Sequence, residues 1–171
     1  AGNFAAGVEA RADGFDKLAA YGKAGGQFRW LIDVNNDGVP DLNVPEPAQI
    51  NGLPVAGRFD GNNQNGDEVG LYSAGTTNGS TWYFDTNHDF KVDYSLKSQL
   101  HGVPFVGDFD GDGYDDLATW QDDTFQFDLA KGALRGWDGI VDASVTFRFG
   151  FIGVRERPVA ADLDQDGYDD I

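Results

Sequence analysis

The feature that most constrains this chain is an internal repeat with a period of about fifty residues. The segments GLPVAGRFDG, GVPFVGDFDG and RPVAADLDQDG align with one another, and a degenerate copy, GNFAAG, opens the chain. Equivalent residues of the four copies lie 55, 50 and 54 residues apart, namely Gly2, Gly57, Gly107 and Ala161. A fixed period of this length is typical of repeat architectures such as propellers and solenoids.

A second marker lies between the copies of the first, at residues 28–44, 80–96 and 124–145. In each copy, apolar residues alternate with other residues just before an acidic loop, which is typical of a half-buried strand. These apolar residues are Trp30, Ile32, Trp82, Phe84, Phe125 and Phe127. Each unit therefore runs strand, acidic loop, strand, turn, strand, acidic loop, strand. Helical periodicity is rare, and residues 5–20 are the one ambiguous segment.

Four short strands per unit predict an all-β chain of β-propeller-type blades, each with four antiparallel strands. We expect a single repeat array over 1–171, with about three complete repeats at 2–56, 57–106 and 107–160 and a partial fourth at 161–171. The alternative is a β-sandwich with Asp-rich turns, because Asp and Asn favour turns. Turn preference alone does not explain the same spacing in four loops.

Four acidic loops share Asp or Asn at positions 1, 3, 5 and 9: DVNNDGVPD, DTNHDFKVD, DFDGDGYDD and DLDQDGYDD. Calcium takes six to eight oxygen ligands, often including one backbone carbonyl, which the seventh residue of each loop can offer. The sequence therefore predicts calcium ligands at Asp33, Asn35, Asp37, Val39, Asp41, Asp85, Asn87, Asp89, Lys91, Asp93, Asp108, Asp110, Asp112, Tyr114, Asp116, Asp162, Asp164, Asp166, Tyr168 and Asp170.

Charge supports a cation at these loops, because fourteen of the 29 acidic residues occupy the ligand positions and would repel one another without one. Solvated turns without metal are the alternative. Magnesium suits the loops less, since it keeps its waters. An EF-hand needs an acid at position 12, where three of these loops have Val44, Leu96 and Thr119. Glycine after position 5 allows the sharp reversal, and Phe90 replaces it in one loop.

The remaining loops are degenerate. Arg58 stands at position 1 of the loop that follows GLPVAG, which leaves Asp60 and Glu68 as remnants of a site. In the first copy Asn3, Ala5 and Lys17 replace ligands, so we expect no calcium there. The expanded loop between Asp128 and Asp142, which includes Asp138, leaves binding open.

Composition excludes several classes of partner. A formal net charge of -17 repels nucleic acid and anionic membranes. There is no cysteine for a disulfide or a thiolate metal site. We find no apolar run long enough to span a bilayer and no signal-peptide pattern. Because the chain lacks an initiating Met, we expect a processed product or an excised fragment.

The motifs GDFDGDGYDDLATW and WYFDTNHDFKVD resemble FG-GAP/VCBS-type repeats of bacterial surface proteins, which are related to the calcium-bearing blades of integrin α-subunit propellers. The resemblance covers nearly the whole chain. It implies blades of four antiparallel strands, Ca²⁺ in the loops that join strands, and extracellular adhesion or ligand binding by a secreted or cell-surface protein. Propellers usually close with four to eight blades, so three units predict either a piece of a longer parent propeller or chains that complete one another.

No catalytic constellation is visible, and we expect that the chain is not an enzyme. Its two histidines, His88 and His101, are expected to be bystanders, with the His88 side chain in solvent. Trp137 is the best candidate for an exposed aromatic contact. The favoured function is adhesion or self-assembly with other copies of the chain or an extracellular protein. The alternatives are a glycan-binding lectin and a non-catalytic accessory region of a secreted hydrolase.

Overall fold

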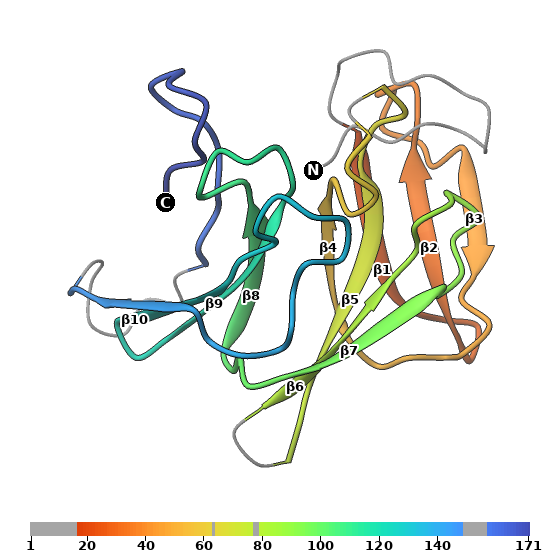
Figure 1. Cartoon of the computed structure of the whole chain (residues 1–171). Coiled ribbons are helices and arrows are strands. Elements are labelled where there is room, and N and C mark those ends of the chain that lie inside the picture. The colour runs from red at the N-terminus through yellow and green to blue at the C-terminus, as the bar shows by residue number, and fades with distance from the viewer. Residues whose placement is uncertain (1–16, 63, 77–78, 149–156) are drawn as a thin grey trace. The chain divides into compact units, whose positions relative to one another are not determined.

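The computed structural model describes residues 17–62, 64–76, 79–148 and 157–171. These residues form eleven β-strands in three antiparallel sheets (Figure 1). These described residues form no helix, and so they include no helix long and apolar enough to cross a membrane. The predicted all-β class is confirmed. Backbone contacts divide the chain into two compact units, residues 1–73 with 82–95 and residues 74–81 with 96–171.

The first sheet contains β1 (Leu18–Ala24), β2 (Gln27–Asp33) and β3 (Leu42–Pro45) in the order β1-β2-β3. Its register pairs Tyr21 with Trp30, and Gly25 and Gly26 form the β1–β2 turn with φ angles of 60° and 87°. A two-residue turn with positive φ at both positions matches the twist of a hairpin. The strand and the degenerate loop expected before β1 fall in residues 1–16, outside the described residues.

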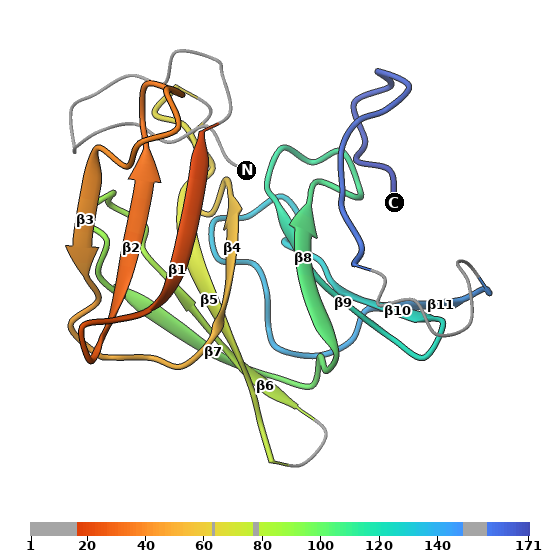
Figure 2. The same ribbon diagram turned by 180° about the vertical axis from the view of Figure 1, so that it is seen from behind.

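The second and third sheets have four strands each and follow the predicted order of strands and acidic loops (Figure 2). The second contains β4 (Leu53–Gly57), β5 (Glu68–Ala74), β6 (Ser80–Phe84) and β7 (Tyr94–Ser98) in that order. The third contains β8 (Val103–Gly107), β9 (Asp116–Gln121), β10 (Thr124–Asp128) and β11 (Ala143–Thr146), with β8 and β11 at its edges. Both sheets begin at the strand that precedes an acidic loop.

Antiparallel order places the acidic loops of a sheet together. The first and third strands of such a sheet run in the same direction, so the loops that follow them leave the sheet at the same end. The β4–β5 and β6–β7 loops therefore meet at one end of the second sheet, and the β8–β9 and β10–β11 loops meet at one end of the third. The two acidic loops of each of these sheets are thus neighbours.

The apolar residues predicted from alternation are buried. Trp30 and Ile32 pack with Val69, Leu71 and Phe90 in one core cluster. A separate cluster contains Phe105, Ala118, Phe125 and Phe127. Burial of one such side chain stabilises the fold by roughly 1.5–3 kcal/mol. These cores fix the strands from which the acidic loops emerge.

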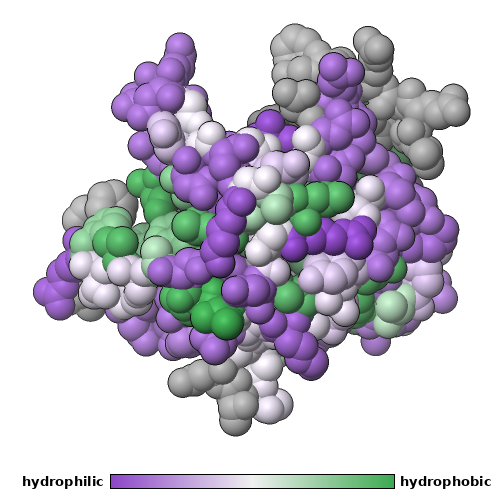
Figure 3. Space-filling view, in the orientation of Figure 1, coloured by the Kyte–Doolittle hydropathy of each residue, from purple (hydrophilic) through white to green (hydrophobic). Residues whose placement is uncertain are grey.

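The surface is less uniformly polar around the third sheet. Hydrophobic residues reach the surface near β8, β9 and β10 (Figure 3). The exposed apolar side chains of this part of the chain include Val145, Phe147, Val159 and Ile171. A contiguous exposed apolar area of this kind is typical of an interaction surface.

Candidate metal centres

The four predicted calcium loops share one backbone conformation. In each loop the residue at position 1 accepts a hydrogen bond through each of its two carboxylate oxygens, one of them from the N–H of position 6. In the third sheet, for example, Asp112 and Gly113 donate to the two carboxylate oxygens of Asp108 at 3.1 and 2.9 Å. The backbone N–H of position 5 donates to the side chain of position 3, and that of position 7 donates to position 5. These bonds turn the side chains of alternate residues inward.

Two positions of each loop have left-handed backbone conformations. Position 4 has a φ between 59° and 74° and is Asn36, His88, Gly111 or Gln165. Position 6 has a φ between 61° and 91° and is Gly38, Phe90, Gly113 or Gly167. Glycine adopts such angles without steric cost, whereas Phe90 adopts the same conformation with its side chain buried in the core. The substitution at Phe90 therefore leaves the loop backbone intact.

The all-aspartate loops bring three carboxylates together. Ligand oxygens of Asp108, Asp110 and Asp116 all lie within 4.8 Å of one another, and those of Asp162, Asp164 and Asp170 do so as well. Desolvation, followed by the charge of Asp112, raises the pKa of Asp110. Burial raises the pKa of Asp116 to about 7. A bound cation would stabilise the ionised form of carboxylates that are disfavoured in this way.

The asparagine-containing loops are closed differently. The side-chain amide of Asn35 donates to Asp41 Oδ1 at 3.3 Å, and that of Asn87 donates to Asp93 Oδ1 at 3.0 Å. The amide N–H thus partly neutralises the acid at position 9. Lys91 Nζ also lies 2.6 Å from Asp89 Oδ2 in the second of these loops. Among the described residues, the acids of these two loops do not form a group of three whose ligand atoms lie within 4.8 Å of one another, so a cation would relieve less repulsion here than in the all-aspartate loops.

The expanded β10–β11 loop contains its own cation. Lys131 Nζ lies 2.9 Å from Asp142 Oδ1 and 3.6 Å from Asp138 Oδ2. Burial would raise the pKa of Asp142, but the hydrogen bond from Lys131 lowers it. Asp128 is fully buried and accepts the backbone N–H groups of Asp138 and Gly139, and burial raises its pKa to about 6. A lysine thus supplies in this loop a positive charge that calcium would supply elsewhere.

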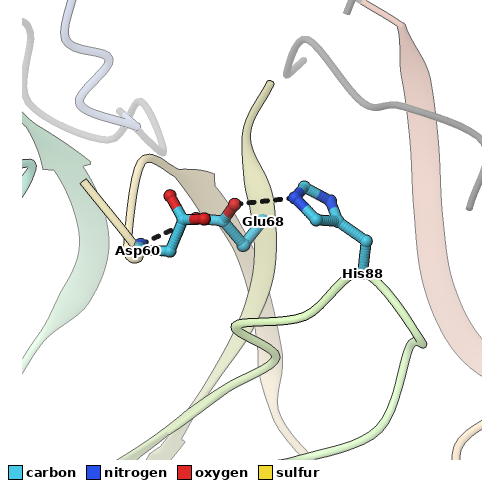
Figure 4. Close-up of side chains that lie close together, drawn as sticks. All are labelled: Asp60, Glu68 and His88. Carbon is cyan, nitrogen blue, oxygen red and sulfur yellow. Dashed lines mark hydrogen bonds and ion pairs between the residues drawn. The ribbon is translucent and has the colours of Figure 1, made fainter. Parts of the chain in front are cut away.

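His88 lies beside the degenerate β4–β5 loop, and the expectation for this residue is wrong. Its side chain is not in solvent but only 7% exposed, and His88 Nε2 lies 2.9 Å from Glu68 Oε1 (Figure 4). Asp60 points toward the same place, and ligand atoms of all three residues lie within 4.8 Å of one another. The sequence indicates the two acids as remnants of a site but gives no sign of the histidine, because no local motif pairs a residue of one loop with a residue of another.

The expectation for Trp137 is also wrong. It was expected to be exposed, but it is 3% exposed, and its indole Nε1 donates to the backbone carbonyl of Asp115 at 3.0 Å. The inserted segment of the β10–β11 loop therefore folds back on the acidic β8–β9 loop. A tryptophan that buries its ring and satisfies its N–H serves packing here.

Comparisons of the chain with protein-family models, with curated proteins and with solved structures found no match.

Proposed function

We propose that this chain is a calcium-stabilised repeat protein with β-propeller-type blades that functions in extracellular adhesion or self-assembly, secreted or on a cell surface. The observation that carries the proposal is the convergence of three carboxylates in each all-aspartate loop, on a backbone that is the same in four loops. Oxygen-only sites of this kind suit calcium better than softer metals.

Calcium would stabilise the folded chain and would take no part in catalysis. The backbone N–H groups of the loop orient each carboxylate, and the cation would compensate charge that is otherwise repulsive. Because the ligands are separated in an unfolded chain, the binding free energy adds to the free energy of folding. We assign the chain no catalytic role.

Contacts between successive repeats support a propeller-type array. The backbone N–H of Asp169 donates to the carbonyl of Asp108 at 2.8 Å, and the N–H of Asp108 donates to Asp169 Oδ2 at 2.9 Å. A Cβ added at Gly107 would lie 2.6 Å from Asp169 Oδ2. One added at Gly111 would lie 2.6 Å from the ring of Tyr168. The two all-aspartate loops are thus packed together, as neighbouring units of a repeat array are.

An apolar hollow in the second unit supports the interaction role. It has a volume of about 340 Å³, and its lining includes the rings of Trp120, Phe125 and Phe147. Val159 and Ile171 complete its apolar wall. Within the described residues the neighbouring strand β11 is an edge strand with all four residues exposed. An exposed apolar surface beside an open strand edge suits association with another β-sheet, from a second copy or from a longer parent propeller.

Glycan binding is the second candidate function, and the same hollow favours it. Aromatic rings with an arginine nearby, here Arg157, can stack on a sugar and donate hydrogen bonds to it. A glycan array distinguishes the two functions, because a lectin binds a defined sugar. An assembly protein forms large particles with no added ligand.

The test of the proposed function is native mass spectrometry of the full chain in millimolar calcium and again after chelation. We expect oligomers that carry about four calcium ions per chain and that dissociate on chelation. A monomer that binds no calcium and stays folded would overturn both the calcium site and the assembly. A calcium-bound monomer that binds one glycan would instead support the lectin.

A further inference from the structure

A cluster of three side chains in the first unit differs in chemistry from the calcium loops. Asp60 comes from the β4–β5 loop, Glu68 from the start of β5, and His88 from the β6–β7 loop (Figure 4). The calcium loops offer only oxygen, whereas this cluster offers an imidazole nitrogen with two carboxylates. Imidazole suits zinc and other first-row transition metals, and calcium prefers oxygen.

The cluster contains buried polar atoms that lack a hydrogen bond. Glu68 is 1% exposed and His88 is 7% exposed. Glu68 Oε1 and His88 Nε2 approach to 2.9 Å, yet neither atom makes a hydrogen bond of acceptable geometry. A buried polar atom without a hydrogen bond normally calls for a further partner such as an ion or a water. In Figure 4 the Glu68 carboxylate lies between Asp60 and His88, and one ligand atom of each of the three residues lies within 4.8 Å of the other two.

Glu68 Oε2 and both carboxylate oxygens of Asp60 accept hydrogen bonds that hold the two carboxylates in place. Glu68 Oε2 accepts the backbone N–H groups of Phe59 and Asp60 at 2.7 and 3.0 Å. The carboxylate oxygens of Asp60 accept the backbone N–H of Asn62 at 2.7 Å and the side-chain amide of Asn65 at 2.9 Å. Hydrogen bonds of this type orient metal ligands from outside the site. They leave Glu68 Oε1 and a lone pair of Asp60 for a cation.

We propose that Asp60, Glu68 and His88 form a zinc site, with His88 Nε2, Glu68 Oε1 and one oxygen of Asp60 as ligands. Bonds of about 2.0–2.1 Å in a tetrahedral site place ligand atoms about 3.3 Å apart, so the His88–Glu68 contact needs to open by only a few tenths of an ångström. Two carboxylates balance the charge of the ion. The fourth position is left for water or for a ligand from another molecule. The site links the β4–β5 loop to the β6–β7 loop.

This site is independent of the proposed function, since it uses none of the calcium ligands. Arg58 replaces the aspartate of position 1 in the β4–β5 loop and thereby removes one calcium ligand there. The β4–β5 loop carries an insertion, and Glu68 takes the place of position 9 in it, because Glu68 pairs with Gly57 as Asp116 pairs with Gly107. The zinc ligands are therefore positions 3 and 9 of that loop and position 4 of the β6–β7 loop. Loss of calcium binding would therefore leave this inference standing, and the reverse also holds.

The test is a zinc titration of the full chain by calorimetry in saturating calcium, which occupies the oxygen-only loops. Wild-type protein is expected to bind one zinc ion, and cobalt is expected to give the visible spectrum of a tetrahedral site. His88→Asn should weaken zinc binding at least tenfold, because it removes the nitrogen ligand. Asn is suited to the φ of 61° at this position, since Asn36 has a φ of 59° at the equivalent position of a sister loop.

The matched control is His101→Asn, which removes the other histidine of the chain and leaves the cluster intact. It should bind zinc as wild type does. Equal zinc affinity in His88→Asn and wild type, or no zinc uptake by wild type, would overturn the proposal.

A second measurement does not depend on the folding of His88→Asn. In His101→Asn protein labelled with ¹⁵N-histidine, His88 is the one imidazole in the sample. Zinc should shift its ring nitrogen resonances, and unshifted resonances would overturn the site.

Discussion

Asp116 Oδ1 accepts the backbone N–H of Ala130 at 2.7 Å, although the two residues belong to different acidic loops of the third sheet. The other oxygen of Asp116 accepts the N–H of Phe109 at 3.0 Å within its own loop. The acid at position 9 thus closes one loop and holds the next. Glu68 occupies the equivalent place in the second sheet, but there its Oε1 lies 2.9 Å from His88 Nε2 and accepts no backbone N–H. The hydrogen bonds of Asp116 connect the two acidic loops of the third sheet, so a cation bound in one loop would also stabilise the other.

Asp110→Asn should weaken calcium binding in the all-aspartate loop of the third sheet by about tenfold, because affinity in such loops depends on the number of charged ligands. Asparagine keeps the oxygen that accepts the N–H of Asp112 at 3.1 Å, so the loop should remain folded. Calcium titration by calorimetry measures the effect. Asp122→Asn makes the same charge change at an exposed turn residue and should bind calcium as wild type does. Equal affinities of the two variants would exclude Asp110 as a ligand.

Asn87→Asp should have opposite effects with and without metal. The asparagine amide donates to Asp93 Oδ1 at 3.0 Å, and an aspartate would replace this bond by repulsion. The free energy of unfolding of the metal-free protein should fall by about 1 kcal/mol, while calcium affinity should rise. Denaturant unfolding with and without calcium measures both. Asn36→Asp adds the same charge outside the ligand positions; a similar gain in affinity there would show that net charge alone is responsible.

Asp128 should make stability depend on pH. Burial raises its pKa to about 6 in the folded protein, against about 3.9 for an aspartate in an unfolded chain. The folded state therefore holds the proton more tightly. This contribution to the free energy of unfolding is fully present below about pH 4 and is lost as the pH rises through about 6. The loss amounts to about 3 kcal/mol.

Asp128→Asn removes this titration, so its free energy of unfolding should decline less than that of wild type between about pH 4 and pH 7. Urea unfolding at a series of pH values measures the difference, with Asp122→Asn as the charge-matched control. Parallel curves for wild type and Asp128→Asn would contradict the prediction.

At position 90 the usual order of stability of alanine and glycine variants should be reversed. The φ of Phe90 is 61°, and its side chain packs against the cluster that contains Trp30 and Ile32. Phe90→Ala should cost about 3–4 kcal/mol through the lost core contacts. Phe90→Gly loses the same contacts but relieves the left-handed conformation, so it should be more stable than Phe90→Ala by about 1 kcal/mol. Thermal unfolding gives the order. A glycine variant less stable than the alanine variant would show that the loop backbone shifts after the ring is removed.

The sequence by itself determined the all-β class, the buried residues of strands such as β2 and β10, and the four loops with Asp or Asn at common positions. These properties are local. Alternation with period two follows from the geometry of a single strand, and the hydrogen bonds that shape a loop such as 108–116 connect residues of that loop. Repetition of the same local pattern in four places made the prediction strong.

Only the tertiary structure decided which loops share neighbours. Antiparallel order in the second sheet brings His88 to Glu68, twenty residues away in the sequence. In the second unit, folding back of the inserted loop buries Trp137 against Asp115. The physical reason is that strand order and register set which side chains meet across a sheet, and the spacing within one loop carries no record of that pairing. The loop sequences therefore indicated calcium, whereas the mixed nitrogen and oxygen site arose only where two loops came together.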